Sequence, residues 1–398
     1  MNSTADIVII GGGVHGCSLA FHLAAAEAGR IVLLEKEHIA AGPTAQSGAM
    51  IRALFNVKIY VDLVTASTRM FENWNEIVGG DAGFVQDGFL RITDTLDPQA
   101  VGGDIELTRQ ASEPCEILSH EQLAQLIPMG RFRQDEVGVL FPTGGYADPY
   151  KTTVELADAA RRQGTQIHEG VQVTGIQTDG GRITAVETDA GTIVTPLVVN
   201  CAGAWSDRIA AMVGIELPIE IQPASTCLFR TPDSMRTIGP ILSDGTNKVY
   251  LRAVGDAVYR AAHFGVAVAT VNADDYDEAV PADHVRMVRE GVDRRYDEMR
   301  RTPYFGGFTA LYDMTPDGHP IVGEMHGVGE MHGAVQDGVE GFWCNCGWSG
   351  NGFAPAPSAG RSLAQMIMGS VPEIDLSYFQ WPRSSHVSRR AHLDWVHP

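Results

Sequence analysis

The stretch Asp6-Ile-Val-Ile-Ile-Gly-Gly-Gly-Val-His-Gly16 decides the fold of this chain. Its apolar start predicts a buried parallel strand, and helix-like sequence follows the last glycine directly. In this Gly-x-Gly-x-x-Gly pattern Gly11 permits a tight turn, Gly13 lets the backbone approach a pyrophosphate, and Gly16 lets the helix pack closely on the strand. The next predicted strand ends at Glu35, at the spacing expected of a carboxylate that binds a ribose. The sequence therefore predicts a Rossmann-like dinucleotide site.

The composition is that of an ordinary globular protein long enough for two domains. The chain has 398 residues, of which 44% are hydrophobic and 20% charged. Its formal net charge of −20 disfavours nucleic acid and anionic membranes as partners, and no apolar run reaches membrane-spanning length. The first predicted strand lies close to Met1, which leaves no room for a signal peptide. Six scattered cysteines form neither a disulfide framework nor a zinc pattern, so we expect a reduced, cytoplasmic chain without a metal.

The segments that favour nucleotide binding lie in three separate parts of the sequence. A second apolar run, Leu197–Cys201, predicts a central parallel strand that is followed by small residues and a helix. Further helices are predicted over 58–78, 150–163, 206–213, 284–301 and 357–368, and the alternation over Phe84–Ile92 indicates a hairpin. We expect a discontinuous nucleotide-binding domain with a second, sheet-based substrate domain inserted twice. The nucleotide-binding domain comprises 1–84, 144–215 and 311–398, and the substrate domain comprises 85–143 and 216–310.

A short repeat stands near the end of the chain, Gly323-Glu-Met-His-Gly327 and then Gly329-Glu-Met-His-Gly333. Its two histidines could be read as a metal loop. No cysteine or further histidine stands at ligand spacing, so the repeat favours a surface hairpin loop instead. No helix pattern follows it, and it is therefore not a second nucleotide fingerprint.

Taken together, four ordered motifs resemble the FAD-dependent amine and amino-acid oxidoreductases of the D-amino-acid oxidase superfamily, near sarcosine oxidase and glycine oxidase. The resemblance covers nearly the whole chain. It implies an α/β architecture of the glutathione-reductase type, with a Rossmann-like FAD-binding domain and a mixed-sheet α+β substrate domain. The motifs are Val8–Gly16 with Glu35-Lys36, Gly42–Arg52, Asn200–Trp205, and Tyr312–Asp317 followed by Gly347–Phe353.

The resemblance also implies a set of FAD-binding residues. Glu35 is expected at the adenosine ribose, Lys36 along the adenine, and the backbone of Val173 at the adenine edge, although Val173 could be a plain strand residue. The turn at Gly350 is expected to place backbone donors near the flavin, although hairpin sterics alone would explain its glycines. The full set is Gly11, Gly13, Val14, His15, Gly16, Glu35, Lys36, Thr44, Ala45, Gln46, Ser47, Gly48, Val173, Ala202, Gly203, Trp205, Gly350, Asn351, Gly352 and Phe353. Within it the role of His15 stays open: it could lie against the pyrophosphate or point to solvent.

Covalent attachment of the flavin is not expected in this chain. Relatives use a histidine in the flavin loop, or a cysteine two positions before the tyrosine of the Tyr-x-x-Thr-Pro motif. Gln46 and Ala310 stand at the positions that align with these attachment sites. The resemblance therefore implies tightly but noncovalently bound FAD.

On the substrate side the resemblance singles out Arg52, Tyr312 and Arg260. His263, which is close to Arg260 in the sequence, could also face the substrate, although a lone histidine in a strand is more often structural. An arginine fork suits a carboxylate, so Arg52 is the expected substrate anchor, with a surface ion pair as the alternative. Tyr312 is expected to line the substrate side of the flavin. Arg260 aligns approximately with a lysine that speeds the reaction of reduced flavin with oxygen, which leaves oxidase versus dehydrogenase open. Ala354 replaces a second carboxylate-binding lysine, which favours a larger or differently anchored substrate than a small N-methyl amino acid.

The implied reaction is hydride transfer to flavin N5 from the carbon beside a neutral amine of an amino or imino acid, giving an imine that water hydrolyses. Oxygen or another acceptor would then reoxidise the flavin. One alternative is oxidation of a 2-hydroxy acid, for which His263 would be the base. Another is a flavin subunit that passes electrons to a partner chain, and homo-oligomers are also possible. An NAD-dependent dehydrogenase is disfavoured because the later motifs match flavin contacts.

Overall fold

A six-stranded sheet forms the base of the fold in this computed structural model, which describes residues 3–97, 101, 103–235, 239–255, 257–265, 268–325, 330–331, 334–335 and 338–383. Its strand order is β19-β22-β13-β2-β3-β9, and all neighbours are parallel except β19 and β22. The strands are β2 (Ile7–Ile10), β3 (Ile31–Glu35), β9 (Gln166–Glu169), β13 (Val198–Asn200), β19 (Ile321–Glu324) and β22 (Phe342–Cys346). The predicted central strand is therefore confirmed, because β13 lies between β22 and β2.

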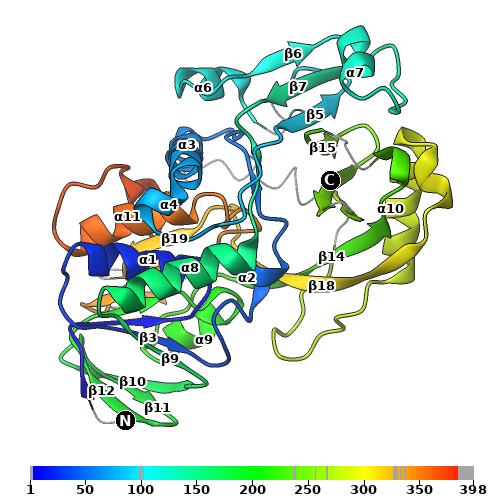
Figure 1. The fold of residues 1–398 in the computed structure, drawn as a ribbon. Coiled ribbons are helices and arrows are strands. Elements are labelled where there is room, and N and C mark those ends of the chain that lie inside the picture. The colour runs from blue at the N-terminus through cyan, green and yellow to red at the C-terminus, as the bar shows by residue number, and fades with distance from the viewer. Residues whose placement is uncertain are drawn as a thin grey trace.

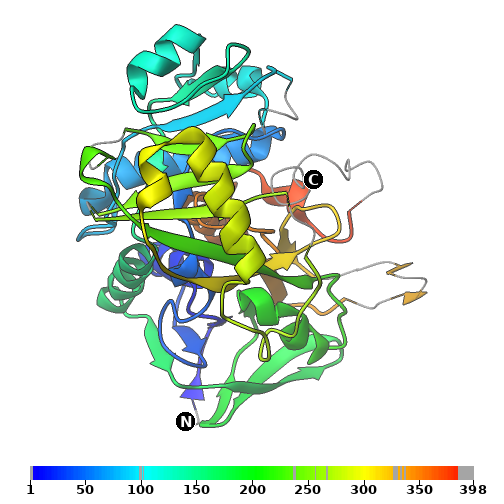
Figure 2. The same ribbon diagram turned by 90° about the vertical axis from the view of Figure 1, so that its right-hand side faces the viewer.

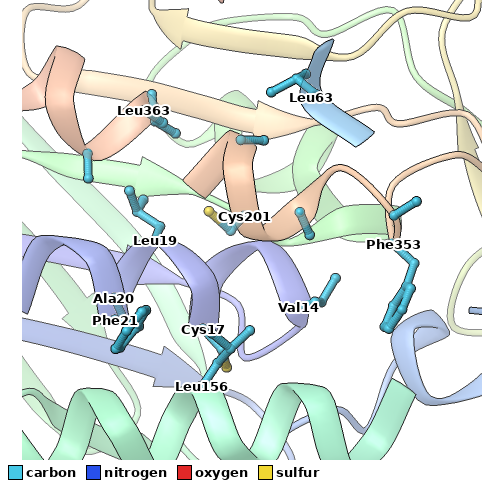
Figure 3. Close-up of a cluster of buried hydrophobic side chains, with 14 of the residues drawn as sticks. Val14, Cys17, Leu19, Ala20, Phe21, Leu63, Leu156, Cys201, Phe353 and Leu363 are labelled. Carbon is cyan, nitrogen blue, oxygen red and sulfur yellow. The ribbon is translucent and has the colours of Figure 1, made fainter. Parts of the chain in front are cut away.

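Both faces of this sheet are covered, which explains why β2 is apolar throughout. Ile7 and Ile9 belong to the core on one face, and Val8 and Ile10 to the core on the other. The first face carries helices α1 (Val14–Ala25), α8 (Pro149–Arg162) and α11 (Ala356–Ile367), as Figure 1 shows. Helix α1 contacts both α8 and α11. In Figure 3, side chains of α1 lie between Leu156 of α8 and Leu363 of α11.

The opposite face packs on a small sheet and a short helix. The small sheet has the order β1-β12-β11-β10. Its strands are β1 (Ser3–Thr4), β10 (Val173–Asp179), β11 (Arg182–Thr188) and β12 (Gly191–Val194), and the helix is α9 (Ser206–Ala211), which follows the turn η1 (Gly203–Trp205). Ile176, Ile183 and Ile209 contribute to the shared core.

An eight-stranded mixed sheet stands beside this base, with the order β18-β14-β17-β16-β15-β5-β7-β6. Its strands are β5 (Phe89–Thr93), β6 (Glu116–Leu118), β7 (Val137–Phe141), β14 (Glu220–Arg230), β15 (Ile241–Asp244), β16 (Val249–Val254), β17 (Val258–His263) and β18 (Tyr304–Met314). Helix α10 (Ala282–Arg295) lies across one face, as Figure 2 shows, and buries Val288 and Val292 against it. The other face turns toward the base.

The remaining elements belong to neither of the two large sheets. They are α2 (Pro43–Gln46), α3 (Lys58–Glu72), α4 (Trp74–Ile77), α6 (Ile105–Gln110), α7 (His120–Leu126), the strands β4 (Met50–Ile51), β8 (Gly145–Tyr146), β20 (Glu330–Met331) and β21 (Ala334–Val335), and the turns η2 (Asp233–Met235), η3 (Glu298–Arg301) and η4 (Leu376–Phe379). In the part of the chain that the structure describes, no helix is long and apolar enough to cross a bilayer.

Two expectations about local structure need correction. The hairpin predicted over Phe84–Ile92 is wrong, because β5 pairs in parallel with β15 and antiparallel with β7 instead of with its own neighbours. The helix predicted over 284–301 ends as α10 at Arg295 and is followed by the separate turn η3. The repeat near Gly323 lies partly outside the described residues, since 326–329, 332 and 333 are not among them.

Candidate functional site

A cavity of about 1050 Å³ lies between the carboxyl ends of the parallel strands and the facing side of the eight-stranded sheet. It begins where β2, β3 and β13 end, which is where open α/β sheets bind ligands. The predicted cofactor residues line it, except Gly16 and Ala45. All four predicted substrate-side residues, Arg52, Tyr312, Arg260 and His263, line it as well. The cavity thus brings together segments from the start, the middle and the end of the chain.

The glycine fingerprint has the geometry that its spacing predicts. Gly11 has φ +112°, and a Cβ atom there would lie 2.4 Å from the carbonyl oxygen of Cys201. A Cβ atom on Gly16 would lie 2.0 Å from the carbonyl oxygen of Gly11, so this glycine serves helix packing and not the cavity wall. Gly13 lines the cavity at the N-terminus of α1, where backbone N–H groups and the helix dipole favour a phosphate.

Glu35 lies at the adenosine end of the predicted site. Its carboxylate accepts hydrogen bonds from the backbone N–H groups of Gly12, at 2.7 Å, and Glu37, at 2.9 Å. These bonds fix the carboxylate at the cavity wall, with oxygen lone pairs left to accept from a ribose hydroxyl. Val173, at the start of β10, also lines this end.

A segment from the far side of the cavity closes over the same end. Lys36 Nζ lies 3.6 Å from the centre of the Trp205 ring, and the Trp205 Nε1–H donates to Asp274 at 2.6 Å. The Asp274 carboxylate also accepts from Arg208 and lies 3.7 Å from Lys36 Nζ. The stretch that carries Asp274 connects β17 to α10, and its Tyr276 also lines the cavity. We call residues 271–279 the strap.

His15 lies in the wall of the cavity and does not point to solvent. Its ring stacks on Trp348, with centroids 4.4 Å apart and planes 13° from parallel. Burial lowers the pKa of His15 to about 3, although the backbone of Gly352 acts in the opposite direction. The imidazole is therefore neutral at physiological pH, and it links the fingerprint to the turn before α11.

Arg52, which is buried, and Tyr312, which is partly buried, both line the cavity. The Arg52 guanidinium lies 4.9 Å from the ring centre of Phe55 and 5.5 Å from that of Phe89. Burial and the neighbouring charge of Arg91 lower the pKa of Arg52, so an anionic ligand beside it would be favourable. Burial raises the pKa of Tyr312 to about 12, which keeps its hydroxyl protonated.

The turn at Gly350 packs directly on Tyr312. Gly350 has φ +79°, and a Cβ atom there would lie 3.2 Å from the Tyr312 ring. The preceding residues are fixed by Asp313, whose Oδ2 accepts from the Gly347 N–H at 2.7 Å. Burial raises the pKa of Asp313 to about 6 against the effect of these backbone hydrogen bonds. Glycine at position 350 is therefore required both by the left-handed backbone of the turn and by its close packing on Tyr312.

His263 lines the cavity from the face of β17 opposite to that of Arg260. Along β17, Arg260 and Ala262 alternate with Ala261 and His263, so the two pairs face opposite sides of the sheet. Arg260 is on the Tyr312 side, whereas Ala261 packs in the core with α10. His263 accordingly lines the part of the cavity next to α10, and burial together with this histidine lowers the pKa of His284 to about 4. The role of His263 as the base of a 2-hydroxy-acid reaction stays a prediction.

The sequence did not predict Asp274 and Asp313, which line the cavity, or Arg252, which binds the carbonyl oxygen of the lining residue Gly48. Asp274 belongs to no motif, and its partners are distant in the chain. The pairing of Arg252 with Arg260 could have been predicted, because the two residues stand at equal distances from the centre of the β16–β17 hairpin; they do pair in register. Among the described residues, no cluster of three or more histidine, cysteine or acidic side chains could hold a metal ion.

The fold and the cavity together define a dinucleotide-binding oxidoreductase class, with the nucleotide and substrate ends on different sheets. The chain belongs to the DAO family of FAD dependent oxidoreductases, which it matches over residues 6–366. The fold class and the FAD dependence expected from the motifs are thereby confirmed.

Individual relatives are similar at moderate identity. Mitochondrial sarcosine dehydrogenase of Mus musculus is 28% identical over 99% of this chain, and the match covers 43% of that protein. Sarcosine oxidase subunit beta of Arthrobacter sp is 25% identical over 91% of this chain and 86% of that subunit. L-proline dehydrogenase from P. horikoshii has the same fold, with a TM-score of 0.84 and 23% identity over 96% of this chain and 97% of that one. The chain thus spans less than half the length of the mouse relative.

Proposed function

We propose that this chain uses FAD to oxidise the C–N bond of an amino or imino acid. The observation that carries the proposal is a single cavity that is lined by the dinucleotide fingerprint, by the buried Arg52 and by Tyr312. The arginine suits a carboxylate and the fingerprint suits the pyrophosphate of a dinucleotide. The names of the relatives, which act on sarcosine and proline, support the same class of substrate.

The residues present fit FAD. Glu35 would accept from the ribose, Gly13 and the start of α1 would receive the pyrophosphate, and the Gly350 turn would meet the flavin. The cavity volume of about 1050 Å³ leaves room for a dinucleotide and a small substrate. Gln46 and Ala310 line the cavity without a side chain suited to attachment, which supports noncovalent binding.

When bound, FAD supplies a two-electron acceptor for the hydride that leaves the substrate carbon. Arg52 would bind the substrate carboxylate and so orient the carbon to be oxidised. Tyr312 keeps its proton, and its hydroxyl can donate to or accept from the substrate. Asp313 holds the turn that leads to Gly350, so backbone donors stay in place. A neutral amine needs no strong base, which fits a site where His263 faces away from Tyr312.

The substrate-anchoring role of Arg52 can be tested by comparing two substrates on two variants. Arg52→Met is expected to lower kcat/KM for an amino acid by about 30-fold or more, because losing one partner of a buried charged pair costs about 2–5 kcal/mol. The corresponding amine without the carboxylate should lose far less, and Arg52→Lys should fall between. Equal losses on both substrates would contradict a carboxylate-binding role.

The similarity to a sarcosine oxidase subunit beta supports a second candidate, in which the chain is the flavin subunit of a larger complex. Gel filtration combined with activity of the isolated chain separates the two, since a self-sufficient enzyme turns over without a partner. The division into a discontinuous FAD domain and a twice-inserted substrate domain remains our proposal for the chain. So does a reducing, cytoplasmic location, which six free cysteines support.

A further inference from the structure

Two buried arginines hold one loop of the cavity wall. Arg252 on β16 and Arg260 on β17 face each other in register, with 6% and 7% of their surfaces exposed. Arg252 Nε donates to the carbonyl oxygen of Gly48 at 2.7 Å. Arg260 Nη1 donates to the carbonyl oxygen of Ser47 at 2.5 Å, and its Nη2 donates to that of Gln46. Three successive carbonyls are therefore bound by two neighbouring guanidinium groups.

The loop is fixed at its other end to the glycine fingerprint. The Thr44 hydroxyl accepts from the Val14 N–H at 3.2 Å, at the start of α1. The Ser47 N–H donates to the carbonyl oxygen of Thr44 at 3.0 Å, which gives the loop a compact turn. Residues 44–48 thus connect the helix that faces the cofactor phosphates to the sheet that faces the substrate.

The two guanidinium charges have no carboxylate partner among the described residues. No Asp or Glu of that set has a carboxylate oxygen within 4.0 Å of either group. Arg252 also donates to the carbonyl oxygen of Ala253 and Arg260 to the hydroxyl of Thr226, so every acceptor named for the two groups is a neutral oxygen. Aromatic rings lie beside both, Tyr146 at 4.3 Å from Arg252 and Phe308 at 5.1 Å from Arg260. Arg260 lines the cavity, and Arg252 binds the lining residue Gly48, so in a chain with a formal net charge of −20 this part of the cavity is locally positive.

We propose that Arg252 and Arg260 are positioning residues that hold the loop 46–48 against the cavity and stabilise negative charge on the bound, reduced flavin. The proposal rests on the proposed function, since it requires FAD in this cavity. Its physical basis is that charges in a site with little water interact more strongly than in bulk water and are already oriented before reaction. An arginine fork can hold carbonyls and keep its charge at once, whereas a lysine offers charge alone.

The test uses the full chain loaded with FAD and two readouts other than turnover, the affinity for sulfite and the midpoint potential of the flavin. Arg252→Gln removes charge and fork, and we expect sulfite to bind about tenfold more weakly. We also expect the equilibrium constant for flavin reduction to fall about tenfold, which for a two-electron couple is a potential lower by about 30 mV. Arg252→Lys keeps the charge, so sulfite affinity should stay within about threefold of wild type while FAD dissociates faster.

Arg289→Gln is the matched control. Arg289 on α10 also donates to backbone carbonyls and lies 4.4 Å from the Phe229 ring. Its acceptors, Met299 and Thr302, do not line the cavity, whereas Gly48, the acceptor for Arg252, does. Its replacement should change stability without changing sulfite affinity or potential.

Sulfite affinity and potential in Arg252→Gln that equal those of Arg289→Gln would overturn the electrostatic part. Wild-type FAD release in Arg252→Lys would overturn the positioning part. A wild-type chain that takes up no FAD would instead overturn the proposed function, and this proposal with it.

Discussion

His15 and Trp348 stack face to face, with ring centroids 4.4 Å apart, and so join the start of the chain to the turn before its last long helix. Trp348 is held in turn by its indole N–H, which donates to Asn345 Oδ1 at 2.9 Å. The stack forms part of the cavity wall between the glycine fingerprint and the Gly350 turn. His15 stands where the fingerprint usually has an apolar residue, and its contact with Trp348 across the site explains its presence there.

Gly352→Ala should disturb this stack. A Cβ atom at Gly352 would lie 2.9 Å from His15 Nε2 and 2.9 Å from Trp348 Cβ, so one of the two rings must move. Overpacking of this kind costs about 1–3 kcal/mol, which predicts FAD affinity lower by about tenfold or more. Isothermal titration of the apo-protein with FAD measures it. Gly239→Ala, where an added Cβ meets nothing within 4 Å, should bind FAD like wild type, and equal affinity in both variants would contradict the account.

The strap should slow the release of FAD. Asp274→Asn removes the charge that binds Arg208 and Lys36 and weakens the acceptor for the Trp205 N–H. Because these groups are half exposed, the loss is modest, and we expect dissociation about three to ten times faster. Stopped-flow flavin fluorescence after dilution measures the rate. The neighbouring exposed Asp275, replaced by Asn, is the control, and identical rates in the two variants would rule out a role for the strap.

His22 should make the stability of the apo-protein depend on pH. Its Nε2 lies 3.0 Å from the carbonyl oxygen of Pro357, and burial and Arg361 lower the pKa of His22 to about 3. Between pH 3 and 6.5 the unfolded chain therefore binds a proton at His22 that the folded chain excludes. The contribution of the neutral, buried His22 to the free energy of unfolding is thus complete above pH 6.5 and is lost as the pH falls toward 3. His22→Gln should flatten the slope of unfolding free energy against pH by up to about 1.4 kcal/mol per unit.

Urea unfolding at pH 5 and pH 7.5 gives this slope. His38→Gln, at an exposed position, is the control for replacing a histidine as such. The expectation fails if His22→Gln and His38→Gln change the slope equally.

Local sequence was sufficient for the nucleotide end of the site. The glycines, Glu35 and the apolar run of β2 act within one strand–turn–helix unit, so spacing alone determines their geometry. The substrate end depends on partners far apart in the chain, and no local pattern indicates that Arg252 would meet Gly48 or that Asp274 would meet Trp205. The strand face of His263 could have been predicted, because residues three apart on a strand, such as Arg260 and His263, face opposite sides.

The most direct measurement is an anaerobic titration of the purified, FAD-loaded chain with amino acids, N-methyl amino acids and cyclic imino acids, followed by flavin absorbance. The account predicts a yellow protein that loses its flavin absorption bands with at least one of these substrates, and that releases its flavin on acid precipitation. A chain that takes up no FAD, or a loaded chain that none of these amines reduces while a 2-hydroxy acid does, would contradict it.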